Sequence, residues 1–189
     1  MSLCGSLLLL HPRRSSVAFR EHPIDHRCRR LLVTADVFFP GAWLSVDVCR
    51  DFCEIADRRT YFYQGKEIDH QTHLGFDLAV TVHIPVLAAN RGIVVYASDL
   101  GIYGNCVILD HGLGVQSLYA HLSSIDVKPG DRVEKAEALG KSGMTGLAGG
   151  DHLHFTMLVD GHRVNPVEWW DTKWMQDRVL RKIAEAGRQ

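Results

Sequence analysis

Histidine and aspartate side chains in two short stretches have the types and spacing of metal ligands. His73 and Asp77 are four residues apart, and residues at this spacing share one face of an extended strand, because side chains alternate with a period of two. His152 and His154 are two residues apart and share a strand face for the same reason. The spacing therefore predicts that each stretch presents two ligating side chains in one direction, so that both stretches could reach a single ion.

Zn²⁺ suits this set of side chains. It accepts imidazole nitrogen and carboxylate oxygen at about 2.0–2.2 Å, and a catalytic zinc site commonly has three protein ligands and one open position. His73, Asp77 and one of the paired histidines, His152 or His154, would complete such a set. Water bound to the zinc would lose its proton near neutral pH and could attack an amide. The other paired histidine and His121, which stands in an apolar stretch, could act as general base and stabilise the oxyanion.

The other histidines have a plainer interpretation. The chain has 11 histidines, and a single one is more often a surface or hydrogen-bonded residue than a ligand. That structural role is expected for His11, His22, His26, His70, His83, His111 and His162. No H-E-x-x-H motif is present, so the sequence does not offer the glutamate base that this motif supplies.

Short strands with glycine-rich turns are the elements that must position the candidate ligands. Runs of β-branched and apolar residues, each of strand length, occupy residues 92–97, 105–110, 116–122, 127–133, 138–140 and 152–159. Strands at this spacing with such connections are typical of a closed or sandwiched antiparallel sheet. We therefore predict a mainly β fold, in the form of a single antiparallel β-sandwich or barrel-like domain with short loops.

One amphipathic helix is expected at the C-terminal end. Asp171 or Thr172 can cap a helix that begins at Lys173. Beyond this start, Met175 and Val179 begin an apolar series that recurs every four residues. The polar face mixes acidic and basic side chains, so the helix is expected to pack on the sheet and not to lie on a membrane.

The first 53 residues lack a sustained period of 3.6 or 2. Short apolar pieces at 31–33 and 37–39 could be strands. Arginines follow the first apolar stretch instead of preceding it, so that stretch is not a convincing export signal. We predict three parts: an N-terminal segment of unassigned character over 1–53, a β domain over 54–170 and a C-terminal helix over 171–189.

Composition argues against several classes of partner and site. Of the 189 residues, 23% are charged and 46% hydrophobic, which is ordinary for a globular domain. The net charge of -1 and the lack of a basic block argue against a nucleic-acid partner. No apolar run reaches about 18 residues, so no transmembrane segment is expected. The five cysteines include no C-x-x-C pair, so neither a thiolate zinc site nor a disulfide framework is indicated.

Residues from about 57 to 170 resemble the lysostaphin-type (LytM-like) zinc endopeptidases, which cut peptide cross-links in peptidoglycan. The matching motifs are His73-Leu-Gly-Phe-Asp77, Gly104-Asn105, Asp110-His111-Gly112, Tyr119-Ala-His121-Leu122, Val127-Lys-Pro-Gly-Asp-Arg-Val133, Ser142-Gly-Met-Thr-Gly146, His152-Leu-His154-Phe155 and Asn165-Pro166. So many motifs in one order are far more specific than any one of them.

The resemblance assigns roles that spacing alone leaves open. It implies one zinc ion per chain, with His73, Asp77 and His154 as ligands, and it implies catalytic roles for His121 and His152. It also implies a zinc metalloendopeptidase that hydrolyses peptide bonds, with peptidoglycan or another extended peptide as substrate. The location that it implies is the cell envelope, either the periplasm or the cell surface.

Two other functions fit part of the sequence. A non-catalytic member of the same family would bind peptidoglycan or regulate an amidase, but such proteins commonly lack one or more ligands, whereas all five site positions are filled here. A biotinyl or lipoyl carrier is suggested by the stretch 127–135, with Lys135 or Lys141 as the modified residue. Pro129-Gly130 is better explained as the turn of a structural hairpin, and a carrier has no use for paired imidazoles.

Overall fold

The computed structural model describes residues 58–64, 66–80 and 82–187. The segment expected over 1–53, with its two candidate strands and four of the five cysteines, lies outside the described residues. Within the described ranges, no helix is both long enough and apolar enough to cross a membrane.

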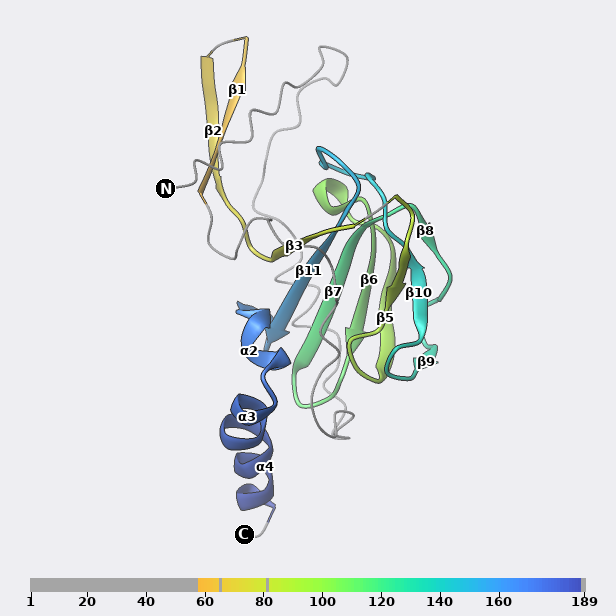
Figure 1. Ribbon diagram of the computed structural model, residues 1–189, viewed down its shortest axis with the longest axis vertical. Helices are drawn as coiled ribbons and strands as arrows, with labels where there is room; N and C mark the ends of the chain where they lie inside the picture. Colours follow the sequence, from red (N-terminus) through yellow and green to blue (C-terminus); the bar gives the residue numbers. More distant parts are fainter. Residues whose placement is uncertain (1–57, 65, 81, 188–189) are drawn as a thin grey trace.

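A seven-stranded antiparallel sheet forms the centre of the fold (Figure 1). Its strands lie in the order β12-β11-β7-β6-β5-β9, and β3 also pairs with β11. The turns before β6 and β7 contain Gly104 and Gly112, whose φ values of 58° and 85° favour glycine. The strands are β3 (Phe76–Ala79), β5 (Gly92–Asp99), β6 (Asn105–Asp110), β7 (Val115–Leu122), β9 (Arg132–Val133), β11 (His152–Val159) and β12 (His162–Val164).

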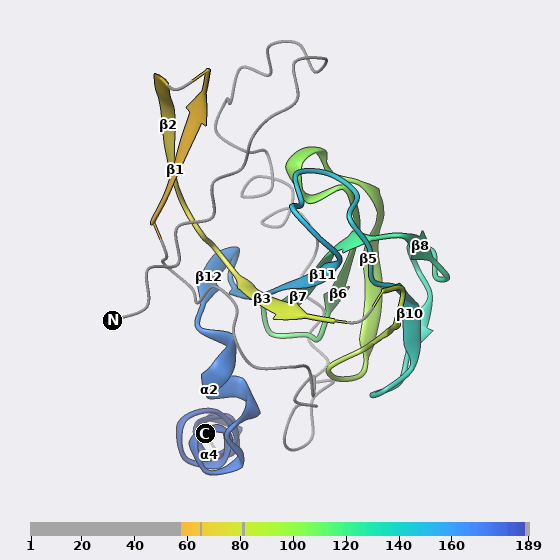
Figure 2. The same cartoon turned by 45° about the horizontal axis from the view of Figure 1, so that its top comes forward.

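A smaller sheet and a hairpin complete the β structure. The smaller sheet has the strand order β4-β10-β8, formed by β4 (Pro85–Leu87), β8 (Ser124–Ile125) and β10 (Ala138–Lys141). The hairpin of β1 (Arg58–Tyr63) and β2 (Lys66–Thr72) projects away from both sheets (Figures 1 and 2). The predicted mainly β, antiparallel fold is confirmed.

The two faces of the main sheet have separate apolar clusters. The larger cluster joins the main sheet to the smaller one and contains Leu139, Tyr119 and Phe155. The smaller cluster lies on the opposite face and contains Ala120 and Leu158. Neighbouring residues of β7 and β11 alternate between the two clusters, as side chains of period two must. On these two strands, a polar side chain whose neighbours point into the larger cluster therefore points to the opposite face of the sheet.

Five of the six strands expected from the sequence are present, and the stretch 127–133 is the exception. Only its last two residues form a strand, β9. Pro129 has no N–H for a ladder, and Gly130 has a φ of 96°, so the chain turns here. Asp131 stabilises the turn, because its Oδ2 accepts a hydrogen bond of 3.0 Å from the backbone N–H of Lys128.

The C-terminal helix predicted from Lys173 is confirmed. Asp171 caps it, because Oδ1 accepts hydrogen bonds from the backbone N–H groups of Lys173 and Trp174 at 2.8 and 2.9 Å. Its middle turn, η2, is a wider π-helix, which the sequence pattern does not predict. Nor does that pattern predict the short helix α2 that precedes it. The segments are α2 (Pro166–Trp170), α3 (Thr172–Trp174), η2 (Met175–Leu180) and α4 (Arg181–Ala186).

A chain of buried hydrogen bonds ties the loop before β5 to the main sheet. Nδ1 of His111 is 2.7 Å from the Arg91 carbonyl oxygen, and Nε2 is 2.7 Å from Oγ of Ser117. Oγ of Ser117 is 3.0 Å from the hydroxyl of Tyr119, which accepts a hydrogen bond of 2.8 Å from the N–H of Ala89. Burial lowers the pKa of His111 to about 4, although the Arg91 carbonyl opposes the shift. His111 therefore has the structural role expected of it.

Candidate metal centre

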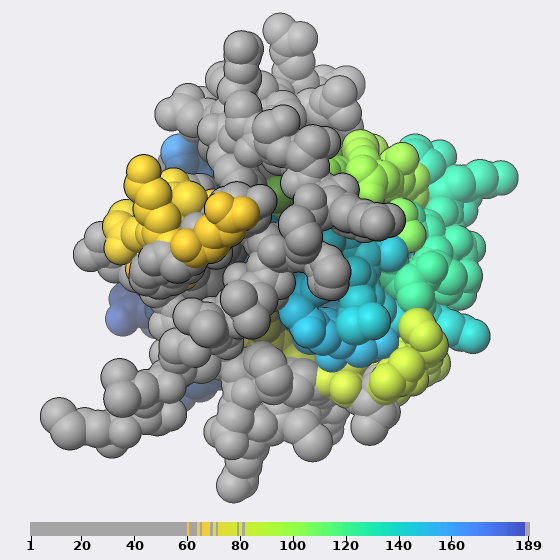
Figure 3. Space-filling model, turned by 90° about the horizontal axis from the view of Figure 1, so that it is seen from above, coloured from red at the N-terminus to blue at the C-terminus, as the bar shows by residue number. Residues whose placement is uncertain are grey.

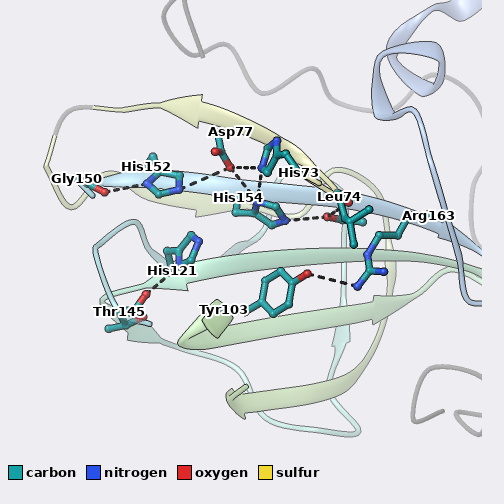
Figure 4. A network of polar contacts seen from close by, with 11 residues as sticks. His73, Leu74, Asp77, Tyr103, His121, Thr145, Gly150, His152, His154 and Arg163 are labelled. Carbon is teal, nitrogen blue, oxygen red and sulfur yellow. Dashed lines mark hydrogen bonds and ion pairs between the residues drawn. The ribbon is translucent and has the colours of Figure 1, made fainter. Parts of the chain in front are cut away.

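Three side chains converge on the face of the main sheet opposite the larger cluster (Figure 4). Oδ1 of Asp77 is 2.9 Å from Nε2 of His73 and 2.8 Å from Nδ1 of His154, and the two nitrogens are 3.1 Å apart. All three residues are buried, with exposed fractions of 6% or less. Across the described ranges, they are the one group of three or more His, Cys, Asp or Glu residues that could hold a metal ion.

Strand register places Asp77 and His154 together. β3 pairs antiparallel with β11, and Asp77 lies directly opposite His154. Opposed residues point to the same face of a sheet, so both polar side chains leave the core on one side. Their neighbours Leu78 and Leu153 pack in the larger cluster on the other side.

His73 reaches the site from outside the strand. It lies between β2 and β3, and a bend at Gly75 turns the chain before β3 begins. The expectation that His73 and Asp77 share one face of a single strand is therefore wrong, although the two side chains do meet. Gly75 is required here because a Cβ would lie 2.5 Å from both Nε2 of His154 and Oγ1 of Thr156.

His121 reaches the same face through a β-bulge in β7. The register between β6 and β7 shifts at this point, so that Ala120 and His121 stand opposite a single residue of β6. His121 has a φ of 62°, a left-handed conformation that is uncommon outside glycine. Regular alternation would turn its ring to the side of Tyr119, into the larger cluster. The bulge re-aims the ring, whose centroid lies 4.7 Å from that of His152 and 5.8 Å from that of His154.

Backbone carbonyl groups orient His121 and His152. Nδ1 of His121 is 2.8 Å from the carbonyl oxygen of Thr145, and Nδ1 of His152 is 2.8 Å from that of Gly150. Because a carbonyl only accepts, Nδ1 carries the proton in each neutral ring and Nε2 is left as an acceptor. Nε2 of His152 lies 3.7 Å from Oδ1 of Asp77. Two imidazoles therefore stand beside the three candidate ligands, each with its Nε2 able to accept a proton.

Burial and mutual contacts set the charges of the site. Burial by itself would raise the pKa of Asp77, but its close contacts with the rings of His154 and His73 outweigh it and hold that pKa well below its usual range. The pKa of His154 is lowered mainly by burial, although Asp77 opposes the shift. Burial also lowers the pKa of His121 to about 3, and nearby His152 adds to this. An ionised carboxylate and neutral imidazoles are the forms that bind metals.

The three converging atoms fit three corners of a zinc site. Ligands placed about 2.0–2.1 Å from zinc at tetrahedral angles lie about 3.3 Å apart. The separations here, 2.8 to 3.1 Å, are close to that value. Two imidazole nitrogens and one carboxylate oxygen are also a typical ligand set of catalytic zinc with an open fourth position. His73, Asp77 and His154 therefore have the chemistry and the spacing to hold a zinc ion.

Two further residues contact this site. Tyr103 comes from the short helix η1 (Gly101–Tyr103), and its ring centroid is 5.3 Å from that of His154. No sequence signal points to it, because η1 approaches β11 only in the folded chain. Thr156 places Oγ1 3.1 Å from Nε2 of His154. The spacing of two residues indicates that Thr156 shares a strand face with His154, but it does not indicate the hydrogen bond between them.

Loops from distant parts of the chain meet at the surface near the site. The N–H of Leu147 donates to the carbonyl oxygen of Ile102 at 2.7 Å, and the N–H of His83 donates to Oδ2 of Asp151 at 3.2 Å. Figure 3 shows the segment that leads into β11, in blue, between the η1 region in green and the loop after β3 in yellow-green. These bonds fix the loop before β11 to η1 on one side and to the loop after β3 on the other.

Known proteins match this part of the chain. The model of peptidase family M23 matches residues 71–166, which include all five candidate site residues. DD-carboxypeptidase/endopeptidase Mpg of Neisseria meningitidis serogroup B is 40% identical over 95 residues, which are 50% of this chain and 22% of that protein. Peptidoglycan DD-endopeptidase ShyA of Vibrio cholerae is 38% identical over 96 residues, which are 51% of this chain and 22% of that protein.

A solved structure has the same fold. The crystal structure of a zinc containing peptidase from Vibrio cholerae is 26% identical with a TM-score of 0.56, and the match covers 68% of this chain and 39% of that one. The matched region spans about a fifth of the length of the curated relatives.

Proposed function

Because the chain belongs to peptidase family M23, we propose that it is a zinc metalloendopeptidase that hydrolyses peptide bonds in the stems or cross-bridges of peptidoglycan. Two kinds of likeness support the substrate and the metal. A relative is named as a peptidoglycan DD-endopeptidase, and a structure with the same fold is that of a zinc containing peptidase. The same likeness supports a place in the cell envelope.

A single observation carries the proposal: the buried group of His73, Asp77 and His154 has two oriented imidazoles beside it. A purely structural cluster would not need His121 and His152 held by carbonyl groups with their rings 4.7 Å apart. Nor would it place the ring of His121 on this face through a left-handed residue, a strained conformation that is common at functional sites.

Each side chain has a role in this mechanism. His73, Asp77 and His154 would hold the zinc, which when bound polarises a carbonyl and lowers the pKa of bound water to about 7. His121 and His152 present Nε2 as an acceptor, so either can take a proton from the attacking water and return one to the leaving amine. Once protonated, either imidazole also stabilises the oxyanion that forms at the peptide carbonyl.

The second candidate is a non-catalytic member of the family that binds peptidoglycan or regulates an amidase. The filled site argues against it, because a binding protein has no need for two oriented acceptor imidazoles beside a complete ligand set. Zinc retention alone does not separate the two functions, since a binding protein could also keep a metal. Hydrolysis does separate them.

Digestion of purified peptidoglycan by the zinc-loaded chain tests the proposal, with the products identified by mass spectrometry. We expect fragments produced by cleavage of one type of peptide bond, with glycan strands left intact. Matched controls are the chain treated with a chelator, which should leave the polymer uncut, and His121→Ala, which should cut it about 10²–10⁴-fold more slowly. Binding to peptidoglycan without any new peptide ends would favour the non-catalytic function, and glycan cleavage would contradict both.

A further inference from the structure

Thr156 links two of the three candidate ligand segments through its hydroxyl. Its Oγ1 is 3.1 Å from Nε2 of His154 and 3.3 Å from the carbonyl oxygen of Leu74, the residue after His73. Thr156 is only 1% exposed, so bulk water does not compete for these bonds. The other nitrogen of the same ring, Nδ1 of His154, faces Asp77 at 2.8 Å.

The direction of these bonds follows from which atoms carry hydrogen. The Leu74 carbonyl can only accept, so the Thr156 hydroxyl donates to it. The hydroxyl oxygen then offers a lone pair to Nε2 of His154, and Nε2 must be the donor in that bond. A neutral imidazole has a single N–H. Nδ1 therefore keeps its lone pair, and this lone pair is the one directed at Asp77 and His73.

A second tautomer of His154 competes with this one. A proton on Nδ1 would form a charge-assisted bond with the Asp77 carboxylate, 2.8 Å away. In that tautomer Nδ1 could not bind a metal ion. The hydroxyl of Thr156 opposes this second tautomer, because its oxygen is a buried acceptor for a proton carried on Nε2. If the hydroxyl were removed, an N–H at Nε2 would lose its hydrogen bond inside the protein, which is unfavourable.

We propose that Thr156 is a positioning residue of the metal site: it holds His154 in the tautomer whose Nδ1 binds the metal, and it ties β11 to the backbone beside His73. This inference rests on the zinc site of the proposed function. Residues that orient a metal ligand in this way commonly change metal affinity by about 10–100-fold. Gly75 leaves room for the arrangement, because a Cβ there would lie 2.5 Å from Oγ1 of Thr156.

Zinc dissociation constants of the full chain, measured by competition with a chelator of known affinity, test the inference. Thr156→Val keeps the branched shape but removes the hydroxyl, and it should raise the Kd about 10–100-fold. Thr156→Ser keeps the hydroxyl and loses only a methyl group, so its Kd should stay within about threefold of the wild-type value. That change is much smaller than the rise of about 10–100-fold expected for Thr156→Val. Wild-type affinity in Thr156→Val would overturn the inference, as would a Thr156→Ser chain as weak as Thr156→Val.

A second measurement needs no variant, so a folding defect in Thr156→Val does not remove the test. Nitrogen-15 NMR of the imidazole rings in the zinc-free wild-type chain should show the proton of His154 on Nε2, exchanging slowly with water. A proton on Nδ1 would overturn the inference. A wild-type chain that bound no zinc would refute the proposed function, and the position of this proton would still decide the role of Thr156.

Discussion

His154 stands directly opposite Asp77 in the ladder between β3 and β11, and the two side chains are 2.8 Å apart. Main-chain pairing therefore sets the contact between two candidate ligands, and only His73 must be brought in by a loop. A site built on strands in this way holds its geometry better than one built on flexible loops alone. Each of the three side chains should accordingly be needed for metal binding.

Replacing Asp77 or His154 by alanine should remove zinc and hydrolysis together, because each change leaves only two ligands. Zinc per chain can be measured by plasma mass spectrometry after gel filtration. The matched control is His162→Ala, an exposed histidine of β12, which should retain zinc. Full zinc content and activity in Asp77→Ala would rule out its role as a ligand.

Replacing His121 or His152 by alanine should leave zinc bound and lower the hydrolysis rate by about 10²–10⁴-fold, the usual contribution of a positioned acid or base. The informative comparison is between the neighbours His152 and His154, which share one face of β11. His152→Ala should keep the metal and His154→Ala should lose it. The opposite result would reverse the roles of the pair.

Gly75→Ala should weaken zinc binding more than about tenfold, the effect expected when a ligand loses its orientation. The added methyl group would lie 2.5 Å from Nε2 of His154, so the ring or the bend must move. Gly150→Ala is a matched control, because a Cβ there meets nothing within 4 Å. Equal zinc affinities of the two variants would show that the close approach at Gly75 has no effect on the site.

The stability of the fold should fall as the pH is lowered from about 6.5 towards about 4. The pKa of His111 is lowered by burial from 6.5 to about 4 in the folded state. Between these values the unfolded chain binds a proton that the folded chain excludes, so acid favours unfolding. The loss from this one residue approaches about 3 kcal/mol near pH 4, since each pKa unit is worth about 1.4 kcal/mol.

Urea unfolding of the zinc-free chain at several pH values measures this loss. His111→Asn should be less stable than the wild type at pH 7 but should show a smaller loss between pH 6.5 and 4. The same pH dependence in both chains would assign the effect to other residues.

Part of the site follows from alternation alone. The shared face of His152 and His154 needs only a period of two and a strand at that place. The pairing of Asp77 with His154 also needs the register between β3 and β11, which alternation does not give. The strands themselves were predictable because their β-branched runs end at glycine turns. The division of the chain near residues 53 and 170 stays a prediction.

Other parts of the site depend on tertiary contacts that no local pattern encodes. His121 points to the site only because the register between β6 and β7 shifts beside it, and a shift of this kind depends on two strands at once. His73 joins Asp77 through the bend at Gly75, not through strand alternation. The sequence indicated the turn at Pro129, but the apolar residues on either side of it also suggested a strand over 127–133, which is longer than β9.

The hydrogen bond from Ala89 to the hydroxyl of Tyr119 makes one loop amide dependent on the interior of the domain. Tyr119 packs against Phe155, with ring centroids 5.3 Å apart, and both residues are fully buried. The acceptor belongs to the centre of the main sheet, so the bond persists only while the loop after β4 stays docked on that sheet. Deuterium uptake at the amide of Ala89 therefore reports whichever needs less free energy, release of this loop or unfolding of the whole domain, without any added probe.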